Sequence, residues 1–283
     1  MKKLLVATGI YPPDIGGPAT YVKTLQDELP NFGYEVKVVT YANNSETANN
    51  VFKINRHQNI LKKYFEFFKA VYKNIAWADL VYTQGPVSDG LPVFFACKLK
   101  KKKYILKIVG DHAWEQGKQR FGVTEMLDEF QNKKYSCKVE IIRFAQRLVA
   151  RQAVKVITPS HYLKKIVSQW GVDENKIEVV YNSVEEVILE ENRDSLRQQF
   201  GFSGDIICSV GRLVKWKGFD VLIEAMVDLI KVNHDFKLLI FGDGPEKKYL
   251  QEIIDKLQLA DSVKLMGSQP QVKLWQYMGA SDM

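Results

Sequence analysis

The feature that most constrains the fold is an alternation of short apolar strands with helices, which begins near residue 4 and starts again near residue 205. The strands are apolar almost throughout, as expected when helices cover both faces of a parallel sheet. Strand–helix–strand units connect in a right-handed sense and build such a sheet. Because the pattern restarts, the sequence predicts an α/β protein with two doubly wound domains.

In the first half of the chain we expect strands at Leu4–Thr8, Glu35–Thr40, Val51–Arg56, Asp79–Thr83, Tyr104–Val109, Lys155–Thr158 and Lys176–Tyr181. The helices expected between them are Ala19–Phe32, Ile60–Trp77, Leu91–Leu99, a long charged helix Thr124–Ala153, and a helix from Ser160 to Trp170. The next segment, 182–203, is polar and acidic and is interpreted as a linker with one short helix, Asp194–Phe200. We therefore predict a first domain over residues 1–184, a linker over 185–204, and a second domain over 205–283.

The second half predicts three strands, Asp205–Gly211, Phe236–Phe241 and Val263–Met266, and three helices, Gly218–Lys231, Glu246–Leu257 and Pro270–Met278. A doubly wound half places its fourth strand beside its first. The sequence stops at Met283, where that fourth strand should begin. We expect a C-terminally truncated protein in which Ile206–Val210 is a bare sheet edge, which is an aggregation liability.

Composition narrows the class of protein further. A hydrophobic content of 46% excludes a disordered chain, and 40 Lys and Arg against 33 Asp and Glu give a net charge of +7 that favours anionic partners. Three widely spaced cysteines form no CxxC or Cys/His cluster, so neither a metal site nor a disulfide framework is expected. No apolar stretch approaches the roughly 20 residues needed to span a bilayer. A cytoplasmic protein, soluble or peripheral on the inner face of the membrane, fits best.

Two loops have the chemistry of phosphate sites. The segment Pro12–Thr20 joins the first strand to the first helix and contains the pair Gly16 and Gly17, which lets backbone N–H groups approach an anion at a helix N-terminus. The segment Gly211–Gly218 lies between strand and helix in the second half and carries Arg212 and Lys217, which can bind phosphate oxygens. A third turn, with Gly244 in it, follows the next strand. The alternatives are a plain tight turn and a solvated basic turn.

These motifs together resemble a known family. The Pro-Pro-x-x-Gly-Gly start, the strand-ending Asn182, Phe200-Gly201, the Gly-Arg…Lys-Gly segment and Phe241-Gly-Asp-Gly-Pro245 occur in the order seen in family four (group 1) glycosyltransferases of the GT-B fold, which have two Rossmann-like domains. The resemblance implies a retaining transferase that uses a nucleotide-diphosphate sugar and needs no metal ion or other cofactor. It assigns the donor's diphosphate to Arg212 and Lys217, with Gly16, Gly17 and Gly244 nearby on loops that should converge on it.

Two departures from the family limit this transfer of roles. The family's Glu…Glu donor motif would lie beyond Met283, so we expect reduced donor affinity and an impaired or inactive fragment. The active-site histidine of many members falls near Gly110-Asp111-His112, which leaves His112, Asp111 or Gly110 in that position; a solvent-facing loop histidine is the alternative. Glu115, Asp14 and Tyr21 are candidates for contacts on the acceptor side.

The acceptor is expected to be a glycan or a lipid-linked molecule of cell-envelope polysaccharide synthesis, because members of the family often modify these. The lysine run from Lys98 to Lys103 and the Lys- and Phe-rich segment Lys62–Trp77 suit an anionic membrane surface. The alternative is that these aromatic residues belong to the core and the lysines to an ordinary solvated face.

Three other functions are possible for an α/β protein with this charge. A nicotinamide-dependent oxidoreductase needs a G-x-G-x-x-G turn and an acidic ribose ligand after the second strand, where Thr40-Tyr41-Ala42-Asn43-Asn44 stands instead. A nucleic-acid-binding protein would use the positive charge, yet the lysines are scattered and no helix-turn-helix, zinc-finger or RNP signature occurs. An α/β protein that binds nucleotides without transferring a sugar stays open.

Overall fold

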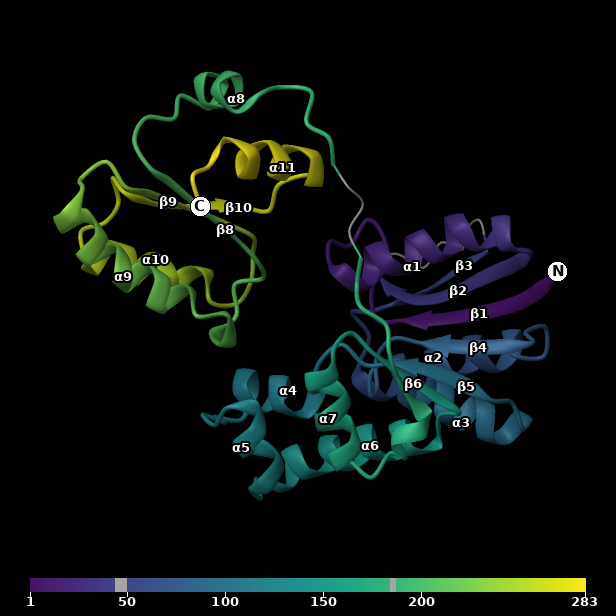
Figure 1. Cartoon of the computed structure of the whole chain (residues 1–283). Coiled ribbons are helices and arrows are strands. Elements are labelled where there is room, and N and C mark those ends of the chain that lie inside the picture. Colours follow the sequence, from purple (N-terminus) through teal and green to yellow (C-terminus); the bar gives the residue numbers. More distant parts are fainter. Residues whose placement is uncertain (44–49, 184–186) are drawn as a thin grey trace. The chain divides into compact units, whose positions relative to one another are not determined.

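The computed structural model describes residues 1–43, 50–183 and 187–283, and the chain divides into two compact units, Met1–Ser183 and Val184–Met283 (Figure 1). The division falls close to the end of the first predicted domain. Residue 184 of the predicted first domain and residues 185 and 186 of the predicted linker lie outside the described residues. The short helix predicted in this segment is α8 (Arg193–Phe200), and it packs against the last helix of the second unit.

Unit 1 is built on one parallel sheet of seven strands in the order β3-β2-β1-β4-β5-β6-β7. The strands are β1 (Lys2–Thr8), β2 (Tyr34–Ala42), β3 (Val51–Asn55), β4 (Leu80–Thr83), β5 (Tyr104–Lys107), β6 (Lys155–Thr158) and β7 (Ile177–Val179). All seven strands were predicted, and the sheet confirms the α/β class. The chain runs outward from β1 to β3 and then returns to place β4 on the other side of β1. The gap between the β1 and β4 ends is therefore the topological switch point, where open α/β sheets bind ligands.

Helices cover both faces of this sheet (Figure 1). They are α1 (Gly17–Glu28) with the 3₁₀ turn Leu29–Phe32, α2 (Ile60–Asn74), α3 (Gly90–Lys100), α4 (His112–Arg120), α5 (Leu127–Asn132), α6 (Cys137–Gln152) and α7 (His161–Gln169). Successive residues of β1 point to opposite faces: Leu4 and Val6 pack with Val22 of α1, while Leu5 packs in the larger core with α2, α3 and α6. This double burial is why β1 reads as an unbroken apolar run.

The single long helix predicted over Thr124–Ala153 is wrong. The structure has α5 and α6 there, separated by the segment from Lys133 to Ser136, and it has α4 before them. The charged, periodic pattern correctly indicates a helix over α6. The helix is broken between α5 and α6, however, and Phe130 of α5 is fully buried. The predicted loop around His112 is instead the beginning of α4.

Unit 2 has a parallel sheet in the order β10-β9-β8, formed by β8 (Ile206–Val210), β9 (Lys237–Phe241) and β10 (Val263–Gly267). The helices α9 (Phe219–Val232) and α10 (Lys247–Lys256) pack on one face, and α8 and α11 (Gln271–Ala280) lie on the other. The stacked rings of Phe200 and Tyr277, 4.1 Å apart, join α8 to α11. The described elements match the predicted restart of the pattern.

The bare edge predicted at Ile206–Val210 is wrong in part, because the last residues of the chain lie along it. The amide of Cys208 donates to the carbonyl of Met283 at 2.7 Å, and the amide of Asp282 donates to the carbonyl of Ile206 at 2.8 Å. The Asp282 carboxylate also accepts from Ile206 N and pairs with Arg197 of α8, 2.8 Å away in each case.

None of the helices that the structure describes is both long and apolar enough to cross a membrane.

Candidate functional site

The glycine pair of unit 1 lies where it was predicted, between β1 and α1. Gly16 has a φ of +156°, which side-chain-bearing residues rarely adopt, and a Cβ there would lie 2.9 Å from Ile10 Cδ1. Gly17 begins α1, and a Cβ on it would meet nothing within 4 Å. No side chain caps this helix end; Pro18 has no N–H and the amides of Ala19 and Thr20 donate to the carbonyl of Gly16, which leaves the N–H of Gly17 and the partial positive charge of the helix end for a ligand. Gly16 is thus needed for the turn, and Gly17 leaves room for a ligand.

The two acceptor-side candidates next to this loop already have partners within unit 1. The carboxylate of Asp14 pairs with the guanidinium of Arg56, which also donates to the carbonyl of Tyr41 at 3.0 Å. Tyr21 lies under Lys107, whose Nζ is 3.3 Å from the centre of the ring. Asp14 therefore fixes Arg56, and Tyr21 covers a buried cation.

Lys107 is the unexpected charge of this region. Its side chain is buried at the end of β5, and its Nζ donates to Oδ1 of Asn182 at 3.0 Å. The structure shows no carboxylate paired with it among the described residues. Burial lowers its pKa from 10.5 to about 8.

This shift predicts that the free energy of unfolding rises with pH more steeply than in Lys107→Met. Between pH 8 and 10.5 the unfolded chain keeps the lysine proton that the folded protein has released, so stability increases as the unfolded state binds more protons. The gain in the wild type from pH 7 to pH 10 should be on the order of 2 kcal/mol relative to the variant. Urea titrations of both proteins across this range measure it, and parallel pH profiles would contradict a buried, pKa-shifted Lys107.

A hollow of about 350 Å³ lies at the switch point of unit 1, and we call it the switch-point hollow. Residues at the carboxyl ends of β1 and β4 line it. The other lining residues include Pro18 of α1, Arg56, which follows β3, and Lys63 of α2. Nε of Arg56 is buried with no hydrogen-bond partner among the described residues. Lys63 forms no ion pair with a described residue and lies 5.5 Å above the ring of Tyr41. Beside the glycine loop, the hollow is therefore lined by Lys63 and by the guanidinium of Arg56, which is ion-paired with Asp14.

The same hollow contains one carboxylate, Asp89, whose oxygens are already bonded to protein donors. Oδ2 accepts from Thr83 Oγ1 at 2.8 Å and from Gly85 N at 2.8 Å, and Oδ1 accepts from Ser88 Oγ at 2.7 Å. Burial raises the pKa of Asp89, opposed by these hydrogen bonds. Asp89 organises the turn after β4, and its oxygens have little capacity left for a ligand.

The two catalytic candidates have different environments in the structure. Asp111 is only 1% exposed; it caps α4 by accepting from Trp114 N at 3.0 Å, and it accepts from Gln146 and Gln131, both at 2.9 Å. It therefore holds α4, α5 and α6 together rather than facing a substrate. His112 is half-buried at the first residue of α4, and burial lowers its pKa, which the charge of Asp111 opposes.

Gly110 and Glu115 belong to the same turn. A Cβ on Gly110 would lie 2.4 Å from Oε1 of Glu115, so the glycine makes room for this half-buried carboxylate. The described geometry thus places Glu115 against the backbone of the turn that precedes His112. His112 is partly accessible and, unlike Asp111, does not cap α4.

In unit 2 the predicted loops after β8 and β9 are bonded to each other. The amide of Leu213 donates to the carbonyl of Asp243 at 3.0 Å, and the amide of Glu246 donates to the carbonyl of Leu213 at 3.1 Å. Leu213 and Val214 are buried beneath them. A Cβ on Gly244 would lie 2.2 Å from the carbonyl oxygen of Leu213, so this glycine allows the two loops to touch.

Arg212 and Lys217 are held on opposite ends of this bonded loop. Both side chains are exposed, and neither forms a salt bridge with any residue of the described part of the chain. Gly218 precedes α9, and no side chain caps that helix. Two cations without an ion pair among the described residues and an uncapped helix N-terminus therefore belong to the segment that follows β8 at the carboxyl edge of the sheet, and these groups are suited to a diphosphate.

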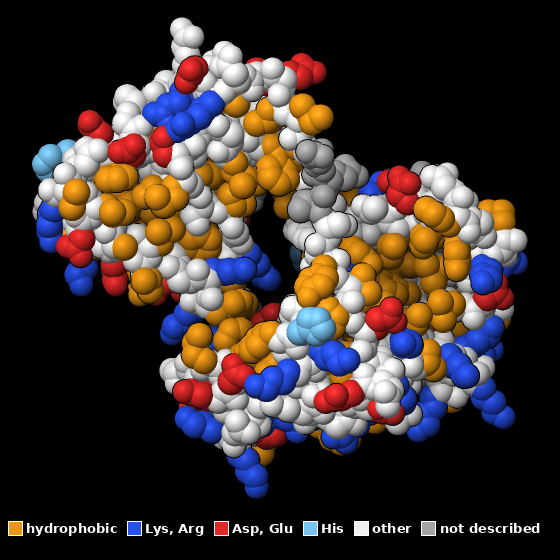
Figure 2. All heavy atoms as spheres, viewed as in Figure 1, with side chains coloured by type: hydrophobic (Ala, Val, Ile, Leu, Met, Phe, Trp, Pro, Cys, Tyr) orange, Lys and Arg blue, Asp and Glu red, His pale blue; other side chains and the backbone are white. Residues whose placement is uncertain are grey.

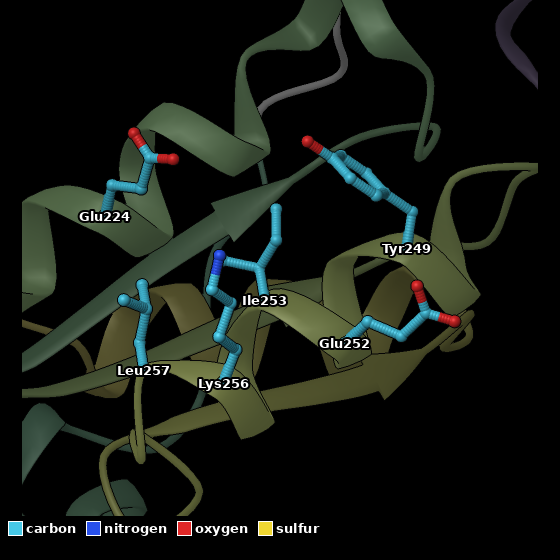
Figure 3. A pocket seen from close by; sticks show the side chains of 6 residues that line it. All are labelled: Glu224, Tyr249, Glu252, Ile253, Lys256 and Leu257. Carbon is cyan, nitrogen blue, oxygen red and sulfur yellow. The ribbon is translucent and has the colours of Figure 1, made fainter.

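Unit 2 has another hollow, of about 290 Å³, between α9 and α10 (Figure 3). Its charged lining is Glu224, Glu252 and Lys256, and none of the predicted site residues takes part. With two carboxylates against one ammonium it does not favour a phosphate ligand.

The sequence interpretation missed Arg56, Lys63 and the turn at Gln84-Gly85, which make the switch-point hollow. A usable signal existed: Arg56 is the last residue of the third predicted strand and Gln84 directly follows the fourth, so both had to lie at the carboxyl edge of the sheet. Nothing in the sequence indicated that Lys63, on a helix, would face the same space.

Comparison with solved structures identifies the class of fold. The chain is similar over its whole length to a sucrose-phosphate synthase from Thermosynechococcus elongatus, with a TM-score of 0.76, 16% identity and 74% of that protein covered. It is similar over its whole length to Anabaena Alr3699/HepE in complex with UDP and glucose, with a TM-score of 0.72, 19% identity and 73% covered. The fold is thus that of GT-B glycosyltransferases, with two Rossmann-like units, as predicted.

Family models then identify the particular family. The model described as "Glycosyltransferase Family 4" matches residues 15–186, and that described as "Glycosyl transferases group 1" matches residues 192–283. The chain belongs to this glycosyltransferase family, which confirms the resemblance read from the motifs.

Two curated relatives show how far the similarity extends. An uncharacterized glycosyltransferase of Methanocaldococcus jannaschii, MJ1607, is 27% identical over 94% of this chain and 69% of its own length. The alpha-monoglucosyldiacylglycerol synthase of Streptococcus pneumoniae is 24% identical over 92% of this chain and 60% of its own length. The chain therefore spans about two thirds of the length of these relatives.

Proposed function

We propose that the protein is a retaining glycosyltransferase that moves a hexose from a nucleotide-diphosphate sugar to a hydroxyl group of a glycan or lipid-linked acceptor. The bond between the anomeric carbon and the diphosphate oxygen breaks, and a bond to the acceptor oxygen forms. The nucleoside diphosphate leaves with the bonding electron pair, and its departing oxygen takes up the proton that the acceptor hydroxyl loses. Membership of the family and the UDP and glucose present in the HepE structure support this proposal.

The observation that carries the proposal is the pair of bonded loops in unit 2. Arg212 and Lys217 are exposed and without an ion-pair partner among the described residues, at the carboxyl edge of the sheet and beside the uncapped α9. Cations fixed in this way stabilise the charge that grows on the diphosphate as the glycosidic bond breaks. We assign them that role, and on this basis propose that the reaction needs no metal ion.

In unit 1 we assign two further roles. The N–H of Gly17 contacts the phosphates of the donor, and Gly16 shapes that turn. His112 contacts the reacting sugar as a neutral imidazole, because its burial lowers its pKa. Asp111 and Glu115 support the turn on which His112 lies. On the acceptor side, Asp14 positions Arg56 by an ion pair, and Tyr21 positions Lys107, whose ammonium lies over its ring.

The acceptor side also suggests a location. Leu61, Phe65 and Leu99 are 81%, 61% and 65% exposed, and exposed lysines neighbour them on α2 and α3. Apolar side chains beside lysines suit an anionic lipid surface. We therefore place the protein peripherally on the cytoplasmic face of a membrane where envelope glycans are made.

On the face shown in Figure 2, Lys and Arg alternate with Asp and Glu, which gives no continuous basic track for nucleic acid.

The proposal predicts selective stabilisation by one class of nucleotide. We expect saturating nucleoside diphosphate or its sugar conjugate to raise the melting temperature by several degrees, because a ligand at 100 times its Kd contributes about 2.7 kcal/mol. UDP, GDP and ADP and their glucose conjugates are compared with the monophosphates and with single-stranded oligonucleotides. Stabilisation by oligonucleotides alone would favour the nucleic-acid alternative. Sugar transfer and the anomeric configuration of the product are followed by NMR. If the nucleotide binds but no product forms, the protein binds nucleotides without transferring a sugar.

A further inference from the structure

Lys107 is a buried charge that the described part of unit 1 leaves poorly compensated. The carboxylates of Asp89 and Asp111 each accept at least three hydrogen bonds, and the guanidinium of Arg143 forms an ion pair and donates to two carbonyls. Lys107 is 2% exposed, and among the described residues its ammonium makes one hydrogen bond, to Asn182, and no ion pair. Burying an ion is costly unless an opposite charge or several hydrogen bonds compensate it. An anion bound nearby would supply the missing compensation.

The position of this ammonium is set by β5 and α1. Lys107 is the last residue of β5, so it lies at the carboxyl edge of the sheet, and it shares with Ile105 the face that α1 covers. Its Nζ lies 3.3 Å from the centre of the Tyr21 ring. Tyr21 follows Gly17 by one helical turn, and helical side chains point back toward the N-terminus. The ammonium is therefore next to the first turn of α1, where the N–H of Gly17 is left for a ligand.

From this placement we infer that Lys107 is the buried counter-charge of the donor's diphosphate, acting through the protein interior on phosphates held at the N-terminus of α1. The inference rests on the proposed transferase function and adds to it a residue that acts without touching the donor. The interior screens charges less than water does. Unit charges about 10 Å apart at an effective dielectric constant of about 20 change a binding constant on the order of tenfold.

The charge of Lys107 can be removed by pH alone. Around it lie Tyr21 of α1, Tyr82 of β4 and the apolar Ile157 of β6, besides Asn182, which does not titrate. Burial raises the pKa of Tyr82, which keeps this phenol neutral. Burial lowers the pKa of Lys107 to about 8. Because the protonated form binds the anion, donor affinity should be highest below pH 8 and should fall as the pH rises above it.

The test titrates UDP-glucose, GDP-glucose and ADP-glucose into the whole chain by calorimetry at pH 7 and pH 9.5. With the conjugate that binds, the wild type should have about tenfold higher affinity than Lys107→Met at pH 7, and the two proteins should bind about equally at pH 9.5. The variant also corrects for every other group that titrates in this range. Coupling is reciprocal, so the saturating conjugate should raise the proton affinity of Lys107 by the same factor, which the ¹³C shift of its Cε measures.

The matched control is Lys102→Met. Lys102 is a half-buried lysine at the opposite end of β5, and its Nζ donates to the carbonyl of Ala78 at 2.7 Å. It changes the net charge as much as Lys107→Met does, but it lies at the amino edge of the sheet, away from the N-terminus of α1. Its affinity for the conjugate should stay within about twofold of the wild type at both pH values, because distant charges are screened.

Each other result overturns the inference in a definite way. An equal loss in Lys107→Met at both pH values assigns the effect to altered packing, and equal losses in Lys107→Met and Lys102→Met assign it to net charge. An unchanged proton affinity of Lys107 in the complex removes the coupling. If Arg212→Ala weakens binding and Lys107→Met does not, the proposed donor site stands and this inference alone is refuted. If none of the three conjugates binds the wild type, the proposed function fails and takes this inference with it.

Discussion

Replacing Arg212 with alanine is expected to weaken the binding of the nucleoside diphosphate by roughly 10- to 150-fold, the range for losing a charge-assisted hydrogen bond of about 1.5–3 kcal/mol. Where turnover is measured, the loss should reach on the order of 100- to 1000-fold, because charge on the leaving diphosphate is greatest in the transition state. Arg212 is exposed, so its removal should not disturb the fold. Lys217→Ala should act in the same direction, as a point charge without the fork of hydrogen bonds.

The control for this prediction is Lys215→Ala, a second exposed lysine in the same 3₁₀ turn, Lys215–Lys217. It changes the net charge as much as Lys217→Ala does, but it has no assigned contact with the diphosphate. Affinity is measured by calorimetry, and the fold by thermal unfolding. Wild-type affinity and rate in Arg212→Ala or Lys217→Ala would refute the roles assigned to them. An equal loss in Lys215→Ala would leave only a general electrostatic effect.

The strands could be predicted from the sequence because each is buried on both faces. β1 lies between two cores, one with α1 and one with α2, α3 and α6, so nearly every residue from Leu4 to Ala7 has to be apolar. The same reasoning located β8 and β9. The helices of the 110–153 region were harder, because their boundaries depend on contacts that are distant in sequence. Asp111 caps α4 locally, but its bonds to Gln131 and Gln146 form only when α5 and α6 fold back.

The candidate site was predictable to the extent that it lies at strand ends. Gly17, Arg212 and Gly244 follow β1, β8 and β9, and the carboxyl ends of parallel strands are where such sheets bind ligands. What each residue does there was not predictable. Gly244 was interpreted as an approach to the ligand, yet it faces the carbonyl of Leu213. The aromatic residues of α2 divide between core and surface, with Phe67 buried and Phe65 exposed, and a helical period alone does not say which side faces the core.

Gly242→Ala should be the most destabilising single-methyl change in unit 2. Gly242 has a φ of +137°, and a Cβ on it would lie 1.9 Å from the carbonyl oxygen of Gly211. Backbone, unlike a flexible side chain, cannot move aside, so β8 and β9 would have to separate at their carboxyl ends. Backbone strain of about 1–3 kcal/mol and overpacking of about 1–3 kcal/mol together predict a loss of roughly 3–5 kcal/mol. That is a large part of the stability of a domain.

The same change should also abolish nucleotide binding. The amide of Gly211 donates to Phe241 O at 2.9 Å, next to Gly242, and this hydrogen bond positions the loop that carries Arg212. Gly267→Ala is the matched control, since Gly267 has a φ of +69° but no atom within 4 Å of its missing Cβ. Its cost should be about 1 kcal/mol, from strain alone, with binding retained. Hydrogen exchange of unit 2 peptides in a urea series separates the two variants. If both lose the same stability, the Gly211–Gly242 contact is not what holds the donor loops together.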